Sequence, residues 1–392
     1  MSRNAKVIGV NMVKFRKPGT HEPYEVMASK AIKGALEDAG IDYKEIQQAY
    51  ASYVYGDSTS GQTALYRVGM SGIPVINVNN NCSSGSTALF LARQAVESGA
   101  LDCVLAFGFE EMKPGALSSN WNDRTSPLGW AQDRLNELKP DLPEGPRAIT
   151  MFGAAGKEYL DKYGANADIF AKVAVKSRSH AIHNPYSLFD NPLTVEEVMN
   201  APIIFPNLTR FMACPPTCGA AAAIVCSEEF AREHGIKDAV EIVAQSMTTD
   251  TVESYDSPIN LVGADMTWRA AQQVYEKAGI GPEDVNVLEL HDCFTPNEVI
   301  TYEGLGLCGF GEAEKFINDQ DNTYGGKYVV NPSGGLMSKG HPLGATGLAQ
   351  CTELVWQLRG QAGKRQVEGA KIALQHNLGL GGACVVTMYR KG

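Results

Sequence analysis

The pattern of apolar and polar residues along the chain repeats itself in order. Residues 35–56 predict the end of a helix, a turn and an apolar strand, and residues 274–294 predict the same elements. In both segments a glycine, Gly40 or Gly279, follows the helix where a left-handed C-terminal residue is needed. The pattern therefore predicts two related helix–turn–strand units.

Two further pairs of matching segments follow in the same order. Residues 73–99 and residues 328–360 each predict an apolar strand, a polar bend and a long helix rich in small residues. Residues 219–227 and residues 382–389 each contain a glycine followed by an apolar strand. This order indicates a duplicated unit in which strands and helices alternate. Each half is therefore expected to hold a mostly parallel sheet covered by helices.

A long polar segment interrupts the first half. It is rich in proline, aromatic and charged residues, and it contains two stretches of helical character, residues 152–164 and residues 168–184. An insertion of this size in a compact unit is usually a binding lid. We therefore expect three parts: an N-terminal half made of residues 1–112 and 211–250, an inserted loop domain of residues 113–210, and a C-terminal half of residues 251–392.

Composition excludes several classes of protein. Hydrophobic residues make up 44% and charged residues 20% of the 392 residues, which is typical of a globular protein with a large core. The formal net charge of −10 gives no general attraction for phosphate backbones, so nucleic acid is not an expected partner. The chain has neither an apolar N-terminal segment nor a run of 18 apolar residues, so we expect no membrane span and no secretion.

Cysteine usage points to a reducing compartment. The nine cysteines include no CxxC pair, which argues against a disulfide scaffold and against a zinc site. We expect a cytoplasmic protein of bacterial type. The peroxisome is the alternative, although the C-terminus MYRKG is not a Ser-Lys-Leu signal.

A cysteine occupies the bend of the first strand–bend–helix segment, in the string NNNCSSGS. Cys82 directly precedes the predicted helix, so it would lie near the free N–H groups and the positive end of the helix dipole. Both favour a thiolate over a thiol, as a nucleophile requires, and the same N–H groups can hold a developing oxyanion. A small buried cysteine without chemistry is the alternative, and it is the commoner fate of a single cysteine.

A histidine occupies the matching bend of the second half, in the string GGLMSKGHPLGATG. His341 precedes a proline that suits the first turn of a helix, and the surrounding glycines indicate close approach of backbone or ligand. Its imidazole can take a proton from a thiol near neutral pH. A histidine that only caps the helix is the alternative. The duplication argues against it, because a two-fold-related fold would bring both bends to one cleft.

Two other predicted strands end in polar residues. The apolar strand VNVLEL ends in His291, Asp292 and Cys293, and the string ALQHNLGLGG places His376 at a strand end before a glycine turn. Strand ends are where α/β sheets place their sites, although structural turns are the alternative at both positions. Three of the seven histidines lie at such ends, which favours a cysteine–histidine catalytic centre over a metal site. The other four are expected at the surface: His21, His180, His183 and His234.

These strings resemble the thiolase superfamily, and within it the thiolase domain of sterol carrier protein-type thiolases. The resemblance covers nearly the whole chain and rests on NNNCSSGSTALFLARQ, HDCF, NTYGGKYVVNPSGG, SKGHPLGATGLAQC and QHNLGLGGA. It implies an α/β thiolase fold, in which two duplicated βαβαβαββ halves form a five-layer αβαβα arrangement with an inserted loop domain. The chain ends where a lipid-carrier domain would start in some relatives, so that domain is not expected.

The resemblance also implies roles for single residues. Cys82 would attack the thioester and hold the acyl group, and His341 would activate Cys82 and help to bind the thioester oxygen. His291 would complete that oxyanion site at a position where many thiolases have an asparagine. In the sterol carrier protein type the HDCF cysteine takes over acid/base work, so Cys293 would have that role here.

The C-terminal motif departs from most thiolases. Those enzymes have a second cysteine where this chain has His376 and Asn377. We therefore also regard His376 as a candidate catalytic residue. The backbone N–H of Cys82 and that of Gly379 or Gly381 would form a second oxyanion site.

The implied activity is acyl transfer between thiols. It is that of a 3-ketoacyl-CoA thiolase or an acetyl-CoA acetyltransferase, acting through acyl-Cys82 in lipid metabolism such as fatty acid β-oxidation. Coenzyme A and acyl-CoA would be substrates, with no tightly bound cofactor or metal, and a homodimer or a dimer of dimers is implied.

Two alternatives to this activity stay open. One is a decarboxylating condensing enzyme of the ketosynthase kind. The other is a catalytically weak acyl-CoA-binding or retro-aldolase-like homologue that needs a partner chain. The retro-aldolases of this group lack the nucleophilic cysteine, so Cys82 argues against that reading.

Overall fold

The computed structural model describes residues 3–115 and 121–392, and it shows the duplication directly. The first half contains β1 (Ala5–Met12), α1 (Tyr24–Ala39), β2 (Gln48–Ser52), α2 (Ser60–Tyr66), β3 (Val75–Val78), α3 (Ser84–Glu97), β4 (Cys103–Glu110), β7 (Gly219–Ser227) and α8 (Glu228–Glu233). The second half contains β8 (Val240–Thr248), α9 (Pro258–Leu261), α10 (Ala264–Ala278), β9 (Val287–Glu289), α11 (Thr295–Gly304), α12 (Ala313–Asn318), β10 (Val329–Val330), α13 (Gly335–Ser338), α14 (Thr346–Arg359), β11 (Ile372–Gly379) and β12 (Ala383–Lys391).

Both halves order their strands in the same way. The first half runs β1-β7-β4-β2-β3 and the second runs β8-β12-β11-β9-β10, as parts of one ten-stranded sheet. In each half four strands point the same way, and β7 or β12 is antiparallel to both of its neighbours. The expected mostly parallel, duplicated sheet is therefore confirmed. Gly40 and Gly279 both end their helices in the left-handed conformation, with φ of 67° and 62°.

The halves meet where β1 pairs with β8. The pairing joins Lys6 to Glu241 and Val7 to Val240, whereas β8 pairs with β12 along its whole length. By strand order β8 is the counterpart of β1 and opens the second half. The boundary expected after residue 250 assigned this strand to the first half.

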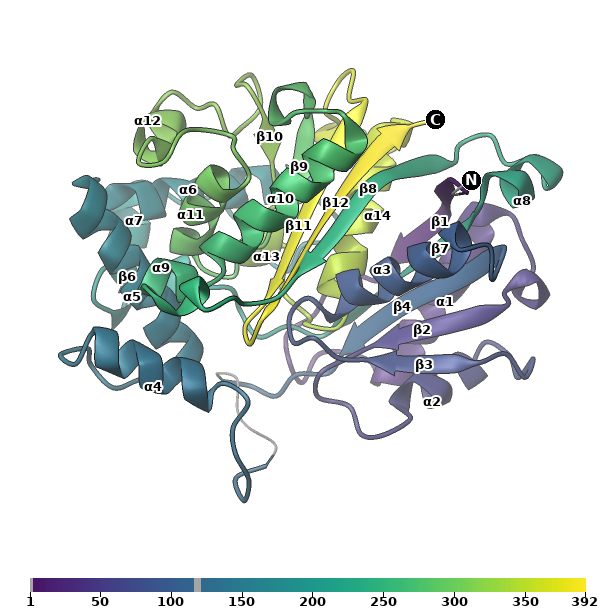
Figure 1. Ribbon diagram of the computed structural model, residues 1–392, viewed down its shortest axis with the longest axis horizontal. Helices are drawn as coiled ribbons and strands as arrows, with labels where there is room; N and C mark the ends of the chain where they lie inside the picture. Colours follow the sequence, from purple (N-terminus) through teal and green to yellow (C-terminus); the bar gives the residue numbers. More distant parts are fainter. Residues whose placement is uncertain (1–2, 116–120) are drawn as a thin grey trace.

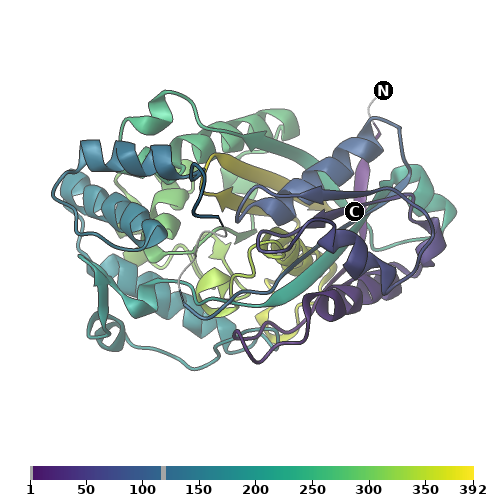
Figure 2. The same ribbon diagram turned by 90° about the horizontal axis from the view of Figure 1, so that it is seen from below.

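Helices form the remaining layers. The helices α3 and α14 pack against each other in the centre, α1 covers β1 and β7, and α10 covers β8 and β12 (Figure 1). Figure 2 shows the same arrangement from below. The central helices contribute small and aliphatic residues to the core, such as Ala88, Ala92, Leu348 and Ala349.

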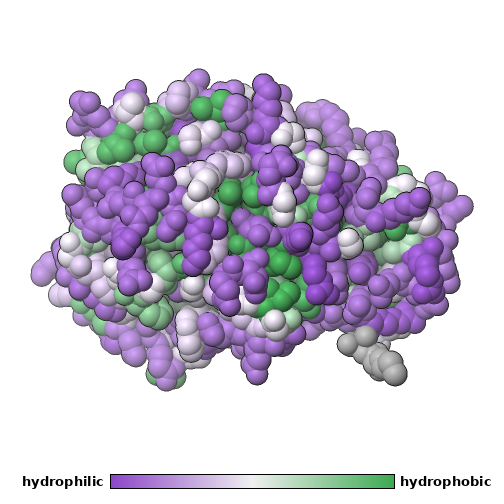
Figure 3. Space-filling model, turned by 90° about the horizontal axis from the view of Figure 1, so that it is seen from above, coloured by the Kyte–Doolittle hydropathy of each residue, from purple (hydrophilic) through white to green (hydrophobic). Residues whose placement is uncertain are grey.

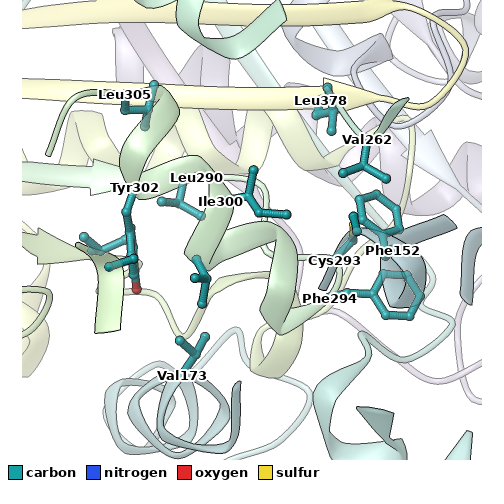
Figure 4. Close-up of a cluster of buried hydrophobic side chains, with 14 of the residues drawn as sticks. Phe152, Val173, Val262, Leu290, Cys293, Phe294, Ile300, Tyr302, Leu305 and Leu378 are labelled. Atoms are coloured by element: carbon teal, nitrogen blue, oxygen red, sulfur yellow. The ribbon is translucent and has the colours of Figure 1, made fainter. Parts of the chain in front are cut away.

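The insertion is helical and packs on the second half. Its elements are α4 (Gly129–Leu138), α5 (Arg147–Tyr163), α6 (Asp168–Ala181), α7 (Val195–Met199), β5 (Ile203–Phe205) and β6 (Leu208–Thr209). The two predicted helical stretches correspond to α5 and α6. Phe152 of α5 stacks on Phe294 with ring centroids 4.9 Å apart, beside Cys293 (Figure 4). The insertion therefore lies against a segment that carries a candidate site residue.

One histidine assigned to the surface is buried. His180 on α6 is 4% exposed, and its ring contacts the carbonyl of Asn331 at 3.0 Å and the hydroxyl of Thr323 at 2.7 Å. The expectation was wrong because α6 turns this polar residue inward, toward the loop before α13. Burial lowers the pKa of His180 to about 3, so it is neutral.

The surface is mainly hydrophilic, and the face shown in Figure 3 has separate hydrophobic patches in the middle and toward the upper left. Among the described residues, no helix is both long and apolar enough to cross a membrane.

Candidate active site

Cys82 lies in the bend between β3 and α3, as predicted. The bend is tight: Asn81 has a φ of 52°, and the N–H groups of Ser83 and Ser84 donate to the carbonyls of Asn80 and Asn81 at 3.2 and 3.1 Å. A non-glycine residue in the left-handed region is strained and is held there by its surroundings. The thiol is buried, with 7% of the residue exposed.

Three predicted site residues converge. The sulfur of Cys82 and one ring nitrogen each of His291 and His341 all lie within 4.8 Å of one another. The two rings meet edge to face, with centroids 4.9 Å apart and an interplanar angle of 83°. His291 follows β9 and His341 lies between α13 and α14, so the duplicated halves deliver these groups to one place.

The hydrogen bonds of His341 identify its protonated nitrogen. The hydroxyl of Thr346 donates to the carbonyl of Pro342 at 3.0 Å, so it accepts from Nδ1–H of His341 at 2.7 Å. Nε2 then carries a lone pair, and it is buried without a hydrogen-bond partner among the described residues. Burial lowers the pKa of His341 to about 3, so the ring is neutral. A neutral imidazole with a free lone pair is in the form that accepts a proton, and at this low pKa it holds that proton only while a negative charge lies beside it.

His291 is held differently. Its Nδ1 lies 3.1 Å from the side-chain Nδ2 of Asn377, and its backbone carbonyl accepts a hydrogen bond from Asn297. Burial, followed by the nearby rings of His341 and His376, lowers the pKa of His291 well below its usual value. This imidazole is therefore also neutral.

The pKa of Cys82 is raised, whereas the sequence predicted that it would be lowered. Burial, followed by repulsion from the Glu110 carboxylate, raises it to about 12, while the local backbone N–H lowers it. The position before α3 was expected to favour the thiolate, but loss of hydration outweighs that contribution. The resting group is a thiol, so a base beside the sulfur is needed, and His341 is placed to supply it.

Cys293 is buried directly before α11. Burial raises its pKa well above the usual value, and the thiols of Cys214 and Cys82 are the next causes. The backbone N–H of Cys214 donates to the carbonyl of Cys293 at 2.8 Å. A thiol that holds its proton at neutral pH can donate it to a developing carbanion.

His376 lies apart from the thiol. It accepts the backbone N–H of His291 at 3.3 Å and contacts the hydroxyl of Thr267 at 3.0 Å, within β11 and not at its end. Successive residues of a strand point to opposite faces, so His376 and Asn377 cannot both face Cys82. The structure brings Asn377 to the site. The sequence could have indicated this, because Asn377 is a polar residue that directly follows His376 in the same strand.

The two glycines predicted for the second oxyanion site, Gly379 and Gly381, lie in different places. A Cβ on Gly379 would lie 2.2 Å from the carbonyl of Asn80, so this glycine packs against the bend of Cys82. Gly381 instead has a φ of 99° and approaches Leu128 of the insertion. Of the two, Gly379 lies beside the bend that holds Cys82.

Sequence reasoning also missed Glu110, at the end of β4. Its carboxylate accepts from the N–H groups of Val54, Tyr55 and Gly344 at 2.9 to 3.0 Å, and it thereby ties the loop after His341 to the first half. Burial raises its pKa to about 7. In the sequence, Glu110 is an acidic residue at the end of an apolar strand, and no motif around it distinguishes it from an ordinary surface carboxylate.

Cys82, His291 and His341 also form a donor set that zinc accepts. Assays of the site should therefore include a chelator.

Two family models match the chain, one to each half. "Thiolase, N-terminal domain" matches residues 6–229, and "Thiolase C-terminal domain-like" matches residues 246–389. The chain belongs to the thiolase family. Two curated relatives agree with this assignment. Sterol carrier protein 2 of Oryctolagus cuniculus is 55% identical over 98% of this chain and 72% of its own length. The acetyl-CoA acetyltransferase of Methanothermobacter thermautotrophicus is 34% identical over 99% of this chain and all of its own.

Two solved structures confirm the fold. Human mitochondrial 3-ketoacyl-CoA thiolase superposes with a TM-score of 0.74 at 19% identity, covering 99% of both chains. The "Ltp2-ChsH2(DUF35) aldolase" superposes with a TM-score of 0.83 at 22% identity, covering 99% of this chain and 98% of that one. The resemblance seen in the sequence is thus confirmed, and the protein is an acyltransferase enzyme of the thiolase family.

Proposed function

We propose that the enzyme cleaves or forms 3-ketoacyl-CoA through an acyl group carried on Cys82, in the degradation or synthesis of lipid acyl chains. The observation that carries the proposal is the convergence of the Cys82 sulfur with His291 and His341 within 4.8 Å. A covalent intermediate divides one difficult step into two easier ones.

The thiolytic direction runs in balanced steps. Nε2 of His341 takes the proton of Cys82, and the thiolate attacks the C3 carbonyl of the substrate. The bond between C2 and C3 breaks, the electron pair stays on C2 as an enolate, and Cys293 supplies the proton that yields acetyl-CoA, while the shortened acyl group stays on Cys82. Coenzyme A then gives its proton to the Cys293 thiolate and attacks acyl-Cys82. The shortened acyl-CoA leaves, and the Cys82 thiolate regains its proton from His341.

The residues around the sulfur fit these charges. The thioester and enolate oxygens become anionic, and N–H donors fixed in a buried site stabilise such charge strongly. His291 and the backbone of the Cys82 bend supply donors of this kind. No step requires a bound cofactor, and coenzyme A and acyl-CoA are the substrates.

The test is mass spectrometry of the intact enzyme after incubation with acetyl-CoA and a chelator. We expect a mass increase of one acetyl group in the native protein and none in Cys82→Ala, with turnover lost in the variant. Cys308→Ala is the matched control, since it removes a partly buried thiol elsewhere in the fold. Normal thiolysis by Cys82→Ala would contradict the covalent route.

A substrate panel separates the alternatives. Short, long, 2-methyl-branched and steroid-derived 3-ketoacyl-CoAs define the acyl group, and a malonyl thioester tests for a decarboxylating condensing enzyme. Cleavage of a 3-hydroxyacyl-CoA without acylation of Cys82 would instead indicate a retro-aldolase.

The proposal extends to a homodimer. The outer edge of β3 is the end of the sheet, and Ile76 on it is 42% exposed. An unpaired edge strand is a template for pairing with another chain. Light scattering should give about twice the mass of one chain, and a monomer at micromolar concentration would contradict this part.

A further inference from the structure

The side-chain amide of Asn377 connects the nucleophile to His291. Its Nδ2 donates to the backbone carbonyl of Cys82 at 3.2 Å and to Nδ1 of His291 at 3.1 Å. A carbonyl oxygen only accepts, so the atom facing Cys82 must be the amide nitrogen. Asn377 is completely buried. One amide thus fixes two parts of the site at once.

The hydroxyl of Ser86, on the first turn of α3, locks this amide in place. Nε2 of Gln375 donates to the carbonyl of Gly347 at 2.6 Å, which identifies it as the amide nitrogen, and to Oγ of Ser86 at 2.8 Å. Ser86 accepts this bond, so its single proton goes to Oδ1 of Asn377 at 2.9 Å.

A further donor stands behind Gln375. The hydroxyl of Tyr389 on β12 donates to Oε1 of Gln375. Hydrogen bonds therefore run in one direction, from Tyr389 through Gln375 and Ser86 to Asn377, and end at His291. Every member of this chain is completely buried, so water cannot exchange with its partners or reverse its direction.

We infer that Asn377 is a positioning residue that holds His291 in the tautomer with an unprotonated Nδ1 and a protonated Nε2, and that Ser86 keeps the amide of Asn377 in the required orientation. The buried ring is neutral, so a lone pair on Nδ1 leaves the proton on Nε2. This deepens the proposed function and rests on it, because an N–H donor is what an anionic thioester or enolate oxygen needs.

The two histidines of the site consequently have opposite tautomers. Thr346 makes Nδ1 of His341 a donor and leaves Nε2 as a base, whereas Asn377 makes Nδ1 of His291 an acceptor and leaves Nε2–H as a donor. One ring can then take a proton while the other stabilises negative charge. The difference comes from the partner of each Nδ1 and not from the pKa of the rings.

The test is nitrogen-15 NMR of histidine-labelled enzyme, in which protonated and unprotonated ring nitrogens have distinct shifts. Comparison with His291→Gln identifies the signals of His291. We expect Nδ1 to be unprotonated and Nε2 to be protonated in the native enzyme. A protonated Nδ1 in that spectrum overturns the inference, and this arm requires no buried charge to be introduced.

The variant Asn377→Asp supplies the second arm. It replaces the donating amide group by an oxygen that only accepts, so a hydrogen bond to His291 requires a proton on Nδ1. We expect the Nδ1 signal to change to the protonated form and kcat to fall by about 10²-fold or more, with little change in KM, as for loss of an oxyanion donor. An Nδ1 that stays unprotonated, in a variant with a cooperative thermal transition, contradicts the inference.

Asn184→Asp is the matched control. Asn184 is also a buried amide that donates to a backbone carbonyl, that of Ser333 at 2.8 Å. It should lose stability while keeping the His291 signals and kcat. If native enzyme shows the expected tautomer but is never acylated on Cys82, the proposed function fails and the tautomer assignment stands. If acylation occurs with the opposite tautomer, only the inference fails.

Discussion

At the scale of single residues, competing effects determine the protonation of the Cys82 thiol. The backbone N–H at Cys82 favours the thiolate, whereas burial and the carboxylate of Glu110 disfavour it, and the net result is a pKa of about 12. Such a thiol is protected from reaction until a neighbouring base removes its proton. In the proposed mechanism His341 is that base.

A first prediction concerns alkylation of Cys82 by iodoacetamide. The rate follows the thiolate fraction, which rises about tenfold per pH unit below the pKa. We expect the rate to keep rising through pH 10 without a plateau. Above pH 7 the carboxyl of Glu110 is ionised and repels the thiolate, so Glu110→Gln should lower the pKa of Cys82 and speed alkylation at pH 8.

Peptide mass spectrometry follows the Cys82 peptide separately from those of the other eight cysteines. A plateau near pH 7 in the native enzyme would mean that Cys82 rests as a thiolate paired with an imidazolium. That outcome would sink the account of a protonated resting sulfur.

At the scale of elements, the two central helices approach each other at glycines. A Cβ on Gly85 of α3 would lie 3.0 Å from the carbonyl of Gly344 and the N–H of Gly347. A Cβ on Gly347 of α14 would lie 2.2 Å from Oγ of Ser86 and 2.6 Å from Oδ1 of Asn377. Close helix crossing therefore brings the bend of Cys82 to the loop of His341.

A second prediction follows for Gly347→Ala. The added methyl group has to displace Ser86 and Asn377, so we expect a loss of about 1–3 kcal/mol in the free energy of unfolding. We also expect lower kcat, because both side chains hold the site. Gly129→Ala is the control, since its Cβ would have Ser126 3.8 Å away as its nearest neighbour. Equal melting temperatures for the two variants would refute the close crossing.

At the scale of the whole molecule, a buried ion pair fastens the insertion to the second half. Lys176 of α6 contacts Glu298 of α11, and the two side chains are 7% and 0% exposed. The hydroxyl of Tyr302 also contacts Glu298. Because α11 starts next to Cys293, this anchor also orients the end of the helix that faces the site.

A third prediction concerns Lys176→Met. It leaves Glu298 buried without its cation, so we expect a loss of about 3–5 kcal/mol in unfolding free energy. The double variant Lys176→Met with Glu298→Gln should recover a large part of that loss. Lys157→Met breaks the exposed pair with Asp161 and should cost less than about 1 kcal/mol. Denaturant unfolding measures all three, and a double variant no more stable than the single one would contradict the argument.

The sequence alone determined the duplication and much of the site. Matching strand–bend–helix segments placed Cys82 and His341 at equivalent bends, and polar residues after an apolar strand marked His291 and Cys293. The predicted bends and strand ends are present in the structure because periodicity, helix ends and glycine turns are local properties of the chain. A repeated local pattern also implies a repeated topology, which carries distant bends to the same place.

Tertiary structure decided the facing, burial and protonation of those residues. It turned His376 away and Asn377 toward Cys82, buried His180, and raised the pKa of Cys82 where the helix end alone predicted a lower one. Each of these depends on the sum of contacts from segments far apart in the chain, such as Ser86 with Asn377 or Glu110 with Gly344. A local sequence pattern cannot predict these contacts. The solvent exposure and the hydrogen-bond partners of each side chain are fixed only when the two halves pack together.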